Sequence, residues 1–318
     1  MPRLLLLDAG GTISSAPTAS GALGAGSGLA LPGPWSGLAV RQVYRGLSEQ
    51  MSLADAQAVV AAALAAADET DIDGIVVAHG TDTLEETAFL ADLVWRSPKP
   101  LVFTGAQRAP GAEDFDGFDN LALALALAED RRARGRGVWV AFGGRLMPAA
   151  GAFKRDTADL AAFDHRAGRA QDLASLTPTA GPRPPPLGDL RLDGSVETLA
   201  AGLGSSTRLL DAAVGSGARG LVLQALGRGN VSDAMVEAAA RAAAAGCVLM
   251  ATSRCPYGAA APDYESGRAL WEAGVVFAGD LGPPQARILL SALLGLHGDP
   301  ATVRLAARDW IAERERAA

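Results

Sequence analysis

Short apolar runs, each bounded by glycine, proline or charged residues, alternate with alanine- and leucine-rich segments of helical periodicity in the first half of the chain. Runs of this length and composition are typical of strands that are buried on both faces of a parallel sheet. Because strands that alternate with helices form βαβ units, the pattern predicts a sheet with helices on both faces. The expected strands are residues 4–7, 74–78, 101–104 and 137–142, and the expected helices are residues 52–67, 83–95 and 120–134.

A proline-rich segment separates this pattern from a second one. Four of the five residues at 182–186 are proline, which favours an extended polyproline conformation. Further on, we expect strands at 220–225, 247–252 and 275–278 and helices at 232–245, 266–273 and 284–296. The chain has 318 residues, about twice the usual size of one domain. We therefore expect an α/β protein with a larger N-terminal doubly wound sheet domain (1–181), a linker (182–206) and a smaller C-terminal α/β domain (207–318).

Composition excludes several classes of partner and cofactor. The formal net charge is −7 and no long Lys/Arg cluster occurs, which argues against nucleic acid. No apolar run is long enough to span a bilayer, and the first run is too short for a signal peptide, so we expect a cytoplasmic protein with no membrane partner. Two cysteines and three scattered histidines predict neither a disulfide framework nor a metal site. We expect no cofactor.

Two polar segments directly follow expected strands, where open α/β folds bind ligands. The first has Thr12 after a pair of glycines, whose backbone N–H groups could face a developing oxyanion. A glycine pair alone is also typical of a simple turn. The second has Thr81 and Asp82 directly before Thr83, which forms a capping-box pattern with Glu86. Capping needs neither Thr81 nor Asp82, so this pair favours a functional site.

Two further features are ambiguous by themselves. Residues 14–34 are rich in Gly, Ala, Ser, Thr and Pro and are too many for a tight connection, so they form a mobile lid or a plain surface loop. Lys154, taken alone, indicates a solvated surface lysine, because lysine is rarely buried.

Taken together, these segments resemble the bacterial L-asparaginase family, types I and II, also called asparaginase/glutaminase. The resemblance spans most of the chain and is carried by residues 10–13, 79–87, 99–108, 116–121, 227–230 and 252–256, and by Lys154 with Asp159 and Phe163. It implies that Thr12 attacks the side-chain amide carbon of a small amino-acid amide, releases ammonia and leaves an acyl-enzyme for water to hydrolyse. Thr81, Asp82 and Lys154 would orient and tune proton transfer. Which threonine attacks first stays open.

The same resemblance implies the substrate contacts and the assembly. Its substrate-binding residues correspond to Gly11, Ser48, Glu49, Gly80, Ala106 and Asn230, with Asp82 also receiving the α-ammonium group. The family forms homodimers or homotetramers, in which Asn230 would act on a neighbour's substrate. Glu49 stands where the family usually has an amide, and its charge would strengthen ammonium binding or repel the carboxylate. The lid lacks the tyrosine of type II members, and Glu265 is an approximate stand-in for their intersubunit carboxylate.

Three other classes of function match parts of the sequence. Residues 215–220 match G-x-G-x-x-G, but they follow a helical segment and precede a strand, the reverse of the dinucleotide-binding order. A catalytically weak amino-acid sensor on the same fold is an alternative, because the lid tyrosine is missing. A glutaminase or another amidase is a second one, because one methylene contributes only about 1–3 kcal/mol of discrimination. The leading expectation is an L-asparaginase that converts L-asparagine to L-aspartate and ammonia.

Overall fold

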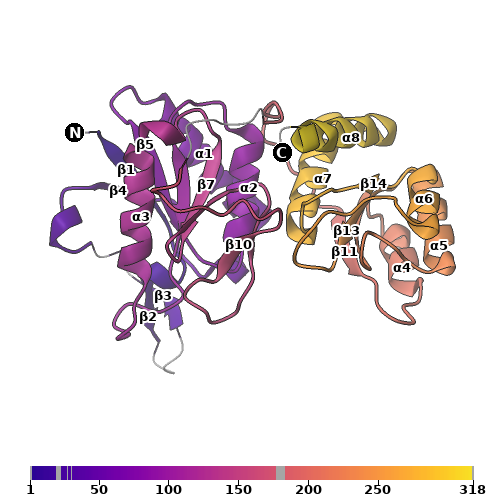
Figure 1. Ribbon diagram of the computed structural model, residues 1–318, viewed down its shortest axis with the longest axis horizontal. Helices are drawn as coiled ribbons and strands as arrows, with labels where there is room; N and C mark the ends of the chain where they lie inside the picture. Colours follow the sequence, from indigo (N-terminus) through magenta and orange to yellow (C-terminus); the bar gives the residue numbers. More distant parts are fainter. Residues whose placement is uncertain (1, 19–22, 27, 30, 177–182, 317–318) are drawn as a thin grey trace. The chain divides into compact units, whose positions relative to one another are not determined.

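The computed structural model describes residues 2–18, 23–26, 28–29, 31–176 and 183–316. The chain divides into two compact units, Met1–Ala180 and Gly181–Ala318. Both are α/β, so the predicted fold class is confirmed: the first unit has a larger mixed sheet and the second a smaller parallel one (Figure 1). Residues 19–22, 27 and 30 of the predicted lid and residues 177–182 at the predicted domain boundary lie outside the described residues.

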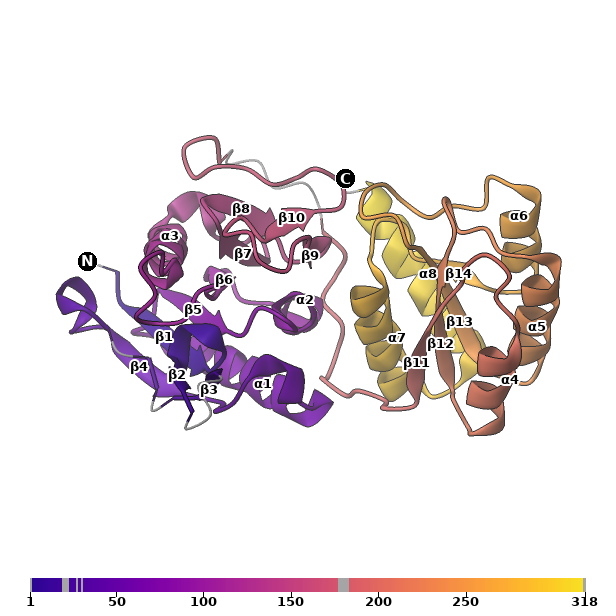
Figure 2. The same cartoon turned by 90° about the horizontal axis from the view of Figure 1, so that it is seen from below.

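The first unit contains a six-stranded sheet in which only the last strand is antiparallel to its neighbour. The strand order is β4 (Ala39–Gln42), β1 (Leu4–Ala9), β5 (Gly74–His79), β6 (Leu101–Thr104), β7 (Val138–Phe142) and β8 (Arg145–Pro148). Helix α3 (Gly117–Glu129) packs on one face, and α1 (Leu53–Asp68) and α2 (Leu84–Val94) cover the other (Figures 1 and 2). Helices on both faces explain why the central strands are apolar without interruption.

The core follows from this double covering. Leu6, Val76 and Val102 are fully buried in a cluster with Leu121 and Ala124 of α3. Their chain neighbours on the same strands are equally buried, because they point to the other face of the sheet. The sheet is therefore a rigid frame, and the residues that follow its parallel strands are presented at one edge.

Short elements complete the first unit. Two antiparallel pairs are present, β2 (Ser15–Pro17) with β3 (Leu23–Ala25) and β9 (Ala152–Lys154) with β10 (Phe163–His165). The 3-10 helices are η1 (Thr12–Ser14), η2 (Gly33–Trp35), η3 (Ser48–Gln50) and η4 (Arg131–Ala133). Most of these elements lie in the connections that follow the parallel strands or lead into the next helix.

The second unit has a four-stranded parallel sheet in the order β11 (Val196–Ala200), β12 (Gly220–Ala225), β13 (Val248–Ser253) and β14 (Val276–Phe277). Strand β11 lies within residues 182–206, where we expected a linker, and it pairs with β12 along its whole length. Residues 215–220 join a helix to β12, in the order that the sequence predicted. The helices are α4 (Arg208–Gly215), α5 (Asp233–Ala244), α6 (Glu265–Glu272), α7 (Pro283–His297) and α8 (Pro300–Arg316).

Candidate active site

The carboxyl ends of β1 and β5 meet at one edge of the larger sheet. Ala9 is the register partner of His79, and the glycines that follow the two strands are packed backbone to backbone. Gly11 has a φ of 80°, and a Cβ at this position would lie 2.2 Å from the Cα atom of Gly80. Only glycine allows this approach without strain. It brings the turn that carries Thr12 beside the turn that carries Thr81.

Lys154 links the second turn to the β9–β10 hairpin. Its Nζ atom donates to Thr81 Oγ1 at 2.8 Å and to Asp82 Oδ1 at 2.7 Å, across more than 70 residues of chain. The Lys154 side chain is 19% exposed, whereas that of Asp82 is 57% exposed. Lys154 is therefore not the solvated surface lysine that its sequence context alone indicated. An amine next to a buried threonine hydroxyl and a carboxylate is an arrangement suited to proton transfer.

The segment with Ser48 and Glu49 also reaches this turn, and it corrects one expectation. Thr83 Oγ1 donates to the backbone oxygen of Ser48 at 3.1 Å and makes no capping hydrogen bond to α2, so the predicted capping box is wrong. The tertiary contact takes the place of the local one. Ser48 is buried against Gly80, where an added Cβ would lie 2.5 Å from Ser48 Oγ, and Glu49 is exposed.

Asp8, which the sequence analysis left without a role, organises the Thr12 turn. It is 1% exposed, and its Oδ1 atom accepts from Gly10 N (3.0 Å) and Ser14 Oγ (2.9 Å), while Oδ2 accepts from Leu29 N (3.0 Å). One carboxylate thus joins Ser14, the first residue of the segment that we expected to form a lid, to Leu29 within the same segment. An aspartate at the end of an otherwise apolar strand is the signal that could have identified it.

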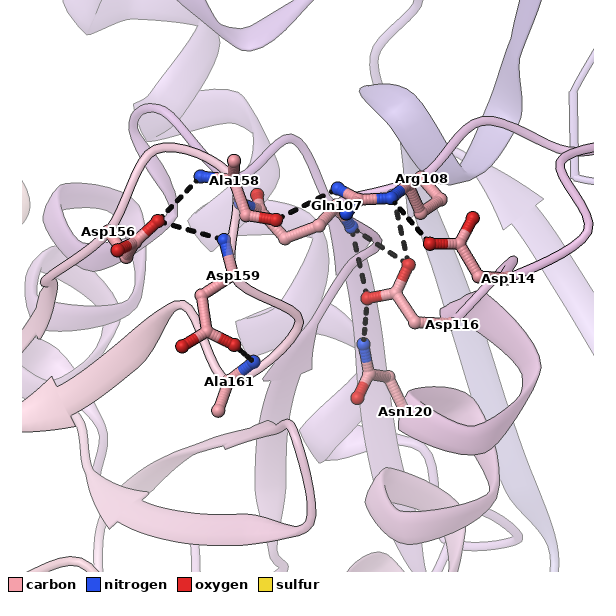
Figure 3. Close-up of polar contacts among 9 residues, drawn as sticks. All are labelled: Gln107, Arg108, Asp114, Asp116, Asn120, Asp156, Ala158, Asp159 and Ala161. Atoms are coloured by element: carbon pink, nitrogen blue, oxygen red, sulfur yellow. Dashed lines mark hydrogen bonds and ion pairs between the residues drawn. The ribbon is translucent and has the colours of Figure 1, made fainter.

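A second buried carboxylate organises the loop that follows β6 (Figure 3). Asp116 accepts from the backbone N–H groups of Gln107 and Arg108 at 3.0 and 2.9 Å and from Asn120 Nδ2 at 2.9 Å. Asn120 Nδ2 also donates to the backbone oxygen of Gly105 at 3.1 Å. These bonds fix the loop that contains Ala106, which is fully buried.

Arg108 extends the same network to the hairpin of Lys154. Its guanidinium donates to Asp114 Oδ2 at 2.9 Å and to the backbone oxygen of Ala158 at 2.8 Å (Figure 3). Asp156 Oδ1 accepts from the backbone N–H groups of Ala158 and Asp159, both at 2.8 Å. The β9–β10 connection is therefore held from outside by Arg108 and from within by Asp156.

His79 is a neutral, structural side chain. Burial lowers its pKa to about 4, although the hydrogen bond to the backbone of Gly80 opposes that shift. Its Nδ1 atom lies 2.9 Å from the Gly80 oxygen, and its ring is 6.2 Å from that of Phe103. Nδ1 therefore donates to the Gly80 carbonyl and helps to fix the backbone next to Thr81.

Asn230 belongs to the second unit, in the connection between β12 and α5. It lines a cavity of about 480 Å³ together with Tyr264, Glu265 and Ser266, and its Oδ1 atom accepts from Ser266 Oγ at 3.4 Å. The structure thus brings together the two residues of the second unit, Asn230 and Glu265, that the family resemblance singled out.

Two absences hold for the residues that the structure describes. No group of three or more His, Cys, Asp or Glu side chains is arranged to hold a metal ion. None of the described helices combines the length and the apolar character that crossing a membrane requires.

An α/β fold in which a lysine contacts a threonine and a carboxylate that follow a parallel strand defines a candidate hydrolase, and comparison with known proteins gives its family. Residues 3–178 match the family described as "Asparaginase, N-terminal", and residues 195–306 match "Glutaminase/Asparaginase C-terminal domain". The chain therefore belongs to the asparaginase family of amidohydrolases, and the resemblance found in the sequence is confirmed.

Individual relatives carry related names. A probable L-asparaginase of Deinococcus radiodurans is 35% identical over 320 residues, which cover 96% of each chain. L-asparaginase 2 of Escherichia coli is 32% identical over 248 residues, 73% of this chain and 69% of the relative. A glutaminase-asparaginase of Pseudomonas aeruginosa is 46% identical over a shorter stretch of 88 residues, 28% of this chain and 24% of the relative.

Proposed function

We propose that this protein is an L-asparaginase that hydrolyses L-asparagine to L-aspartate and ammonia through a threonine acyl-enzyme. The observation that supports this most directly is the contact of Lys154 Nζ with both Thr81 Oγ1 and Asp82 Oδ1. The names of the relatives that match over most of the chain support the choice of substrate.

In the proposed first step, Thr12 Oγ attacks the amide carbon of the substrate. The Thr12 hydroxyl makes no hydrogen bond within the described part of the chain, which leaves it available. Its proton passes by way of Thr81 and Lys154 to the leaving nitrogen, so that the C–N bond breaks and ammonia departs. Backbone N–H groups of the glycine turn are the proposed oxyanion donors. Water then attacks the ester and the same base accepts its proton; the bond between the acyl carbon and Thr12 Oγ breaks, aspartate departs, and the base returns the proton to Thr12 Oγ.

An alternative order of events uses the same groups. Thr81 is the threonine that contacts Lys154, so it could attack first, with Thr12 stabilising the tetrahedral intermediate. Both orders need the same lysine. The rate of acyl-enzyme formation in Thr12→Ala and Thr81→Ala proteins, followed by mass spectrometry, would distinguish them, because only the attacking threonine becomes acylated.

The proposed substrate contacts follow the charges of an amino acid. Asp82 is an exposed carboxylate that would receive the α-ammonium group, and Ser48 lies against Gly80 beside it. Gly11, Gly80 and Ala106 would line the site through their backbones, and Glu49 would add a negative charge at the ammonium end. Asn230 would come from a neighbouring copy in a homodimer or homotetramer. Light scattering coupled to gel filtration would measure that assembly.

Glutamine is a second candidate substrate, because two relatives are named glutaminase-asparaginase. Ammonia release should be measured against L-asparagine, L-glutamine and D-asparagine, with the Thr12→Ala protein as the blank. Release from L-asparagine that depends on Thr12 is expected. Binding of L-asparagine or L-aspartate without release above the blank would instead indicate the amino-acid sensor. The cytoplasmic location stays a prediction, and one relative is named a periplasmic enzyme.

A further inference from the structure

Glu85 is a buried carboxylate that the proposed mechanism does not use. It lies in the first turn of α2, three residues after Asp82, and is 9% exposed. Its Oε2 atom accepts a hydrogen bond from the backbone N–H of Lys154 at 2.5 Å. This hydrogen bond joins α2, which begins after Thr81 and Asp82, directly to β9, whose Lys154 side chain contacts both of those residues.

The geometry of the β9–β10 hairpin explains why this backbone N–H needs such a partner. Lys154 is opposite Phe163, and the next residue, Arg155, donates its N–H to the Ala162 oxygen at 2.8 Å. Hydrogen-bonded and non-hydrogen-bonded pairs alternate in antiparallel ladders, so Lys154 is in a non-hydrogen-bonded pair and its N–H points away from β10. Among the residues that the structure describes, no second strand pairs with β9 on that side. Glu85 supplies the missing acceptor.

The charges around Glu85 come from three elements. Burial raises its pKa to about 7, the hydrogen bond from Lys154 lowers it, Glu86 on the same helix raises it, and Arg166 and the Lys154 ammonium lower it. Arg166 follows β10 and is itself buried, with its guanidinium 5.8 Å from the ring of Phe153. An acceptor that titrates near neutral pH binds the amide most strongly when it is ionised.

We propose that Glu85 is a positioning residue for Lys154: its carboxylate fixes the backbone of β9 so that the lysine amine stays within reach of Thr81 and Asp82. The proposal rests on the proposed function for its catalytic consequence, but the anchor itself is independent of which amide is hydrolysed. Lys154 has a flexible side chain of four carbons, and a displacement of its backbone by about 1 Å would suffice to disrupt a proton transfer.

The test compares Glu85→Ala, which removes the acceptor, with Glu85→Gln, which keeps an oxygen acceptor but cannot ionise. Glu129→Gln, which changes an exposed carboxylate at the carboxyl end of α3, is the control. In Glu85→Ala we expect kcat to fall about 10- to 100-fold, with KM changed far less. At pH 6 the wild-type Glu85 is mostly protonated, so kcat of Glu85→Gln should be close to that of the wild type. Between pH 6 and pH 8 the wild-type carboxylate ionises whereas glutamine cannot, so the ratio of wild-type kcat to Glu85→Gln kcat should rise.

Hydrogen exchange of the full-length proteins, read by mass spectrometry on peptides that cover residues 150–156, tests the anchor without any activity. Faster exchange in Glu85→Ala than in wild type, with Glu129→Gln unchanged, is expected. Unaltered exchange in Glu85→Ala overturns the anchor, and faster exchange with wild-type kcat overturns its role in positioning Lys154.

If Glu85→Ala does not fold, a kcat ratio between wild type and Glu85→Gln that is constant with pH overturns the proposal. Failure of the wild-type protein to release ammonia from any amide would refute the proposed function alone, and the exchange data would still decide the anchor.

Discussion

Burial of Glu85 makes the stability of the first unit depend on pH in a way that can be calculated and measured. Burial raises the Glu85 pKa from 4.5 to about 7, a difference of about 2.5 units. At about 1.4 kcal/mol per pH unit, the ionised carboxylate costs the folded protein about 3.5 kcal/mol relative to the protonated one. Between these two pKa values the folded protein holds a proton that the unfolded chain releases. The contribution of Glu85 to the free energy of unfolding is therefore fully present below pH 4.5, and it is lost as the pH rises through about 7.

Glu85→Gln isolates this effect, because glutamine cannot ionise. Urea unfolding of both proteins should be followed at pH 5, 6, 7 and 8 in the same salt concentration. The unfolding free energy of the wild type minus that of Glu85→Gln should decrease by about 2.5 kcal/mol from pH 5 to pH 8. All other titrating groups, His79 included, are common to both proteins and cancel. A difference that is constant with pH, or one that increases, would show that Glu85 is not held in a desolvated site and would refute the reasoning.

Three further predictions concern single side chains. Lys154→Met should lower kcat at least about 100-fold with little change in melting temperature, and wild-type ammonia release would show that the lysine is not catalytic. Asp8→Ala leaves the donors on Gly10, Ser14 and Leu29 without their acceptor and should cost about 1–3 kcal/mol in urea unfolding, whereas an unchanged midpoint would contradict that role. His79 has its pKa lowered to about 4 by burial, so the stability that it contributes is present above pH 6.5 and is lost as the pH falls toward 4. His79→Gln should remove up to about 3 kcal/mol of that dependence in unfolding at pH 4.5 and 7, and parallel curves for the two proteins would argue against it.

The sheet of the first unit was predictable wherever burial on both faces leaves a continuous apolar run. β1, β5, β6 and β7 coincide with the expected strands to within two residues at each end, because each packs between α3 and the α1–α2 layer. β4 was missed, since its four residues are all exposed and show no apolar pattern. β11 was missed for a similar reason: three of its five residues are exposed, and a proline-rich segment comes shortly before it. Edge strands are held mainly by backbone hydrogen bonds, which leave little trace in side-chain composition.

The candidate site was predictable where its residues directly follow strands, and only from a family resemblance where they do not. Thr12 and Thr81 could be placed at one edge of the sheet because parallel strands end together. Lys154 follows no parallel strand, and its position depends on a hairpin whose partner strand and connecting loop were not recognised in the sequence. At Thr83 the local pattern predicted a capping box that the structure does not contain. The Thr83 hydroxyl instead donates to the backbone oxygen of Ser48, 35 residues earlier.

The role of Glu85 could not be predicted from local sequence patterns. An acidic residue in the first turn of a helix is ordinarily explained by the helix dipole and by capping, and both explanations assume that it is exposed to solvent. Here the same position is covered by β9, so the favourable dipole is outweighed by desolvation and the pKa rises instead of falling. A carboxylate that costs stability at neutral pH is tolerated if it performs a task that an apolar residue cannot. Accepting the backbone N–H of Lys154 is such a task, so a variant with a well-packed leucine at position 85 should be more stable above pH 7 only if β9 finds another acceptor.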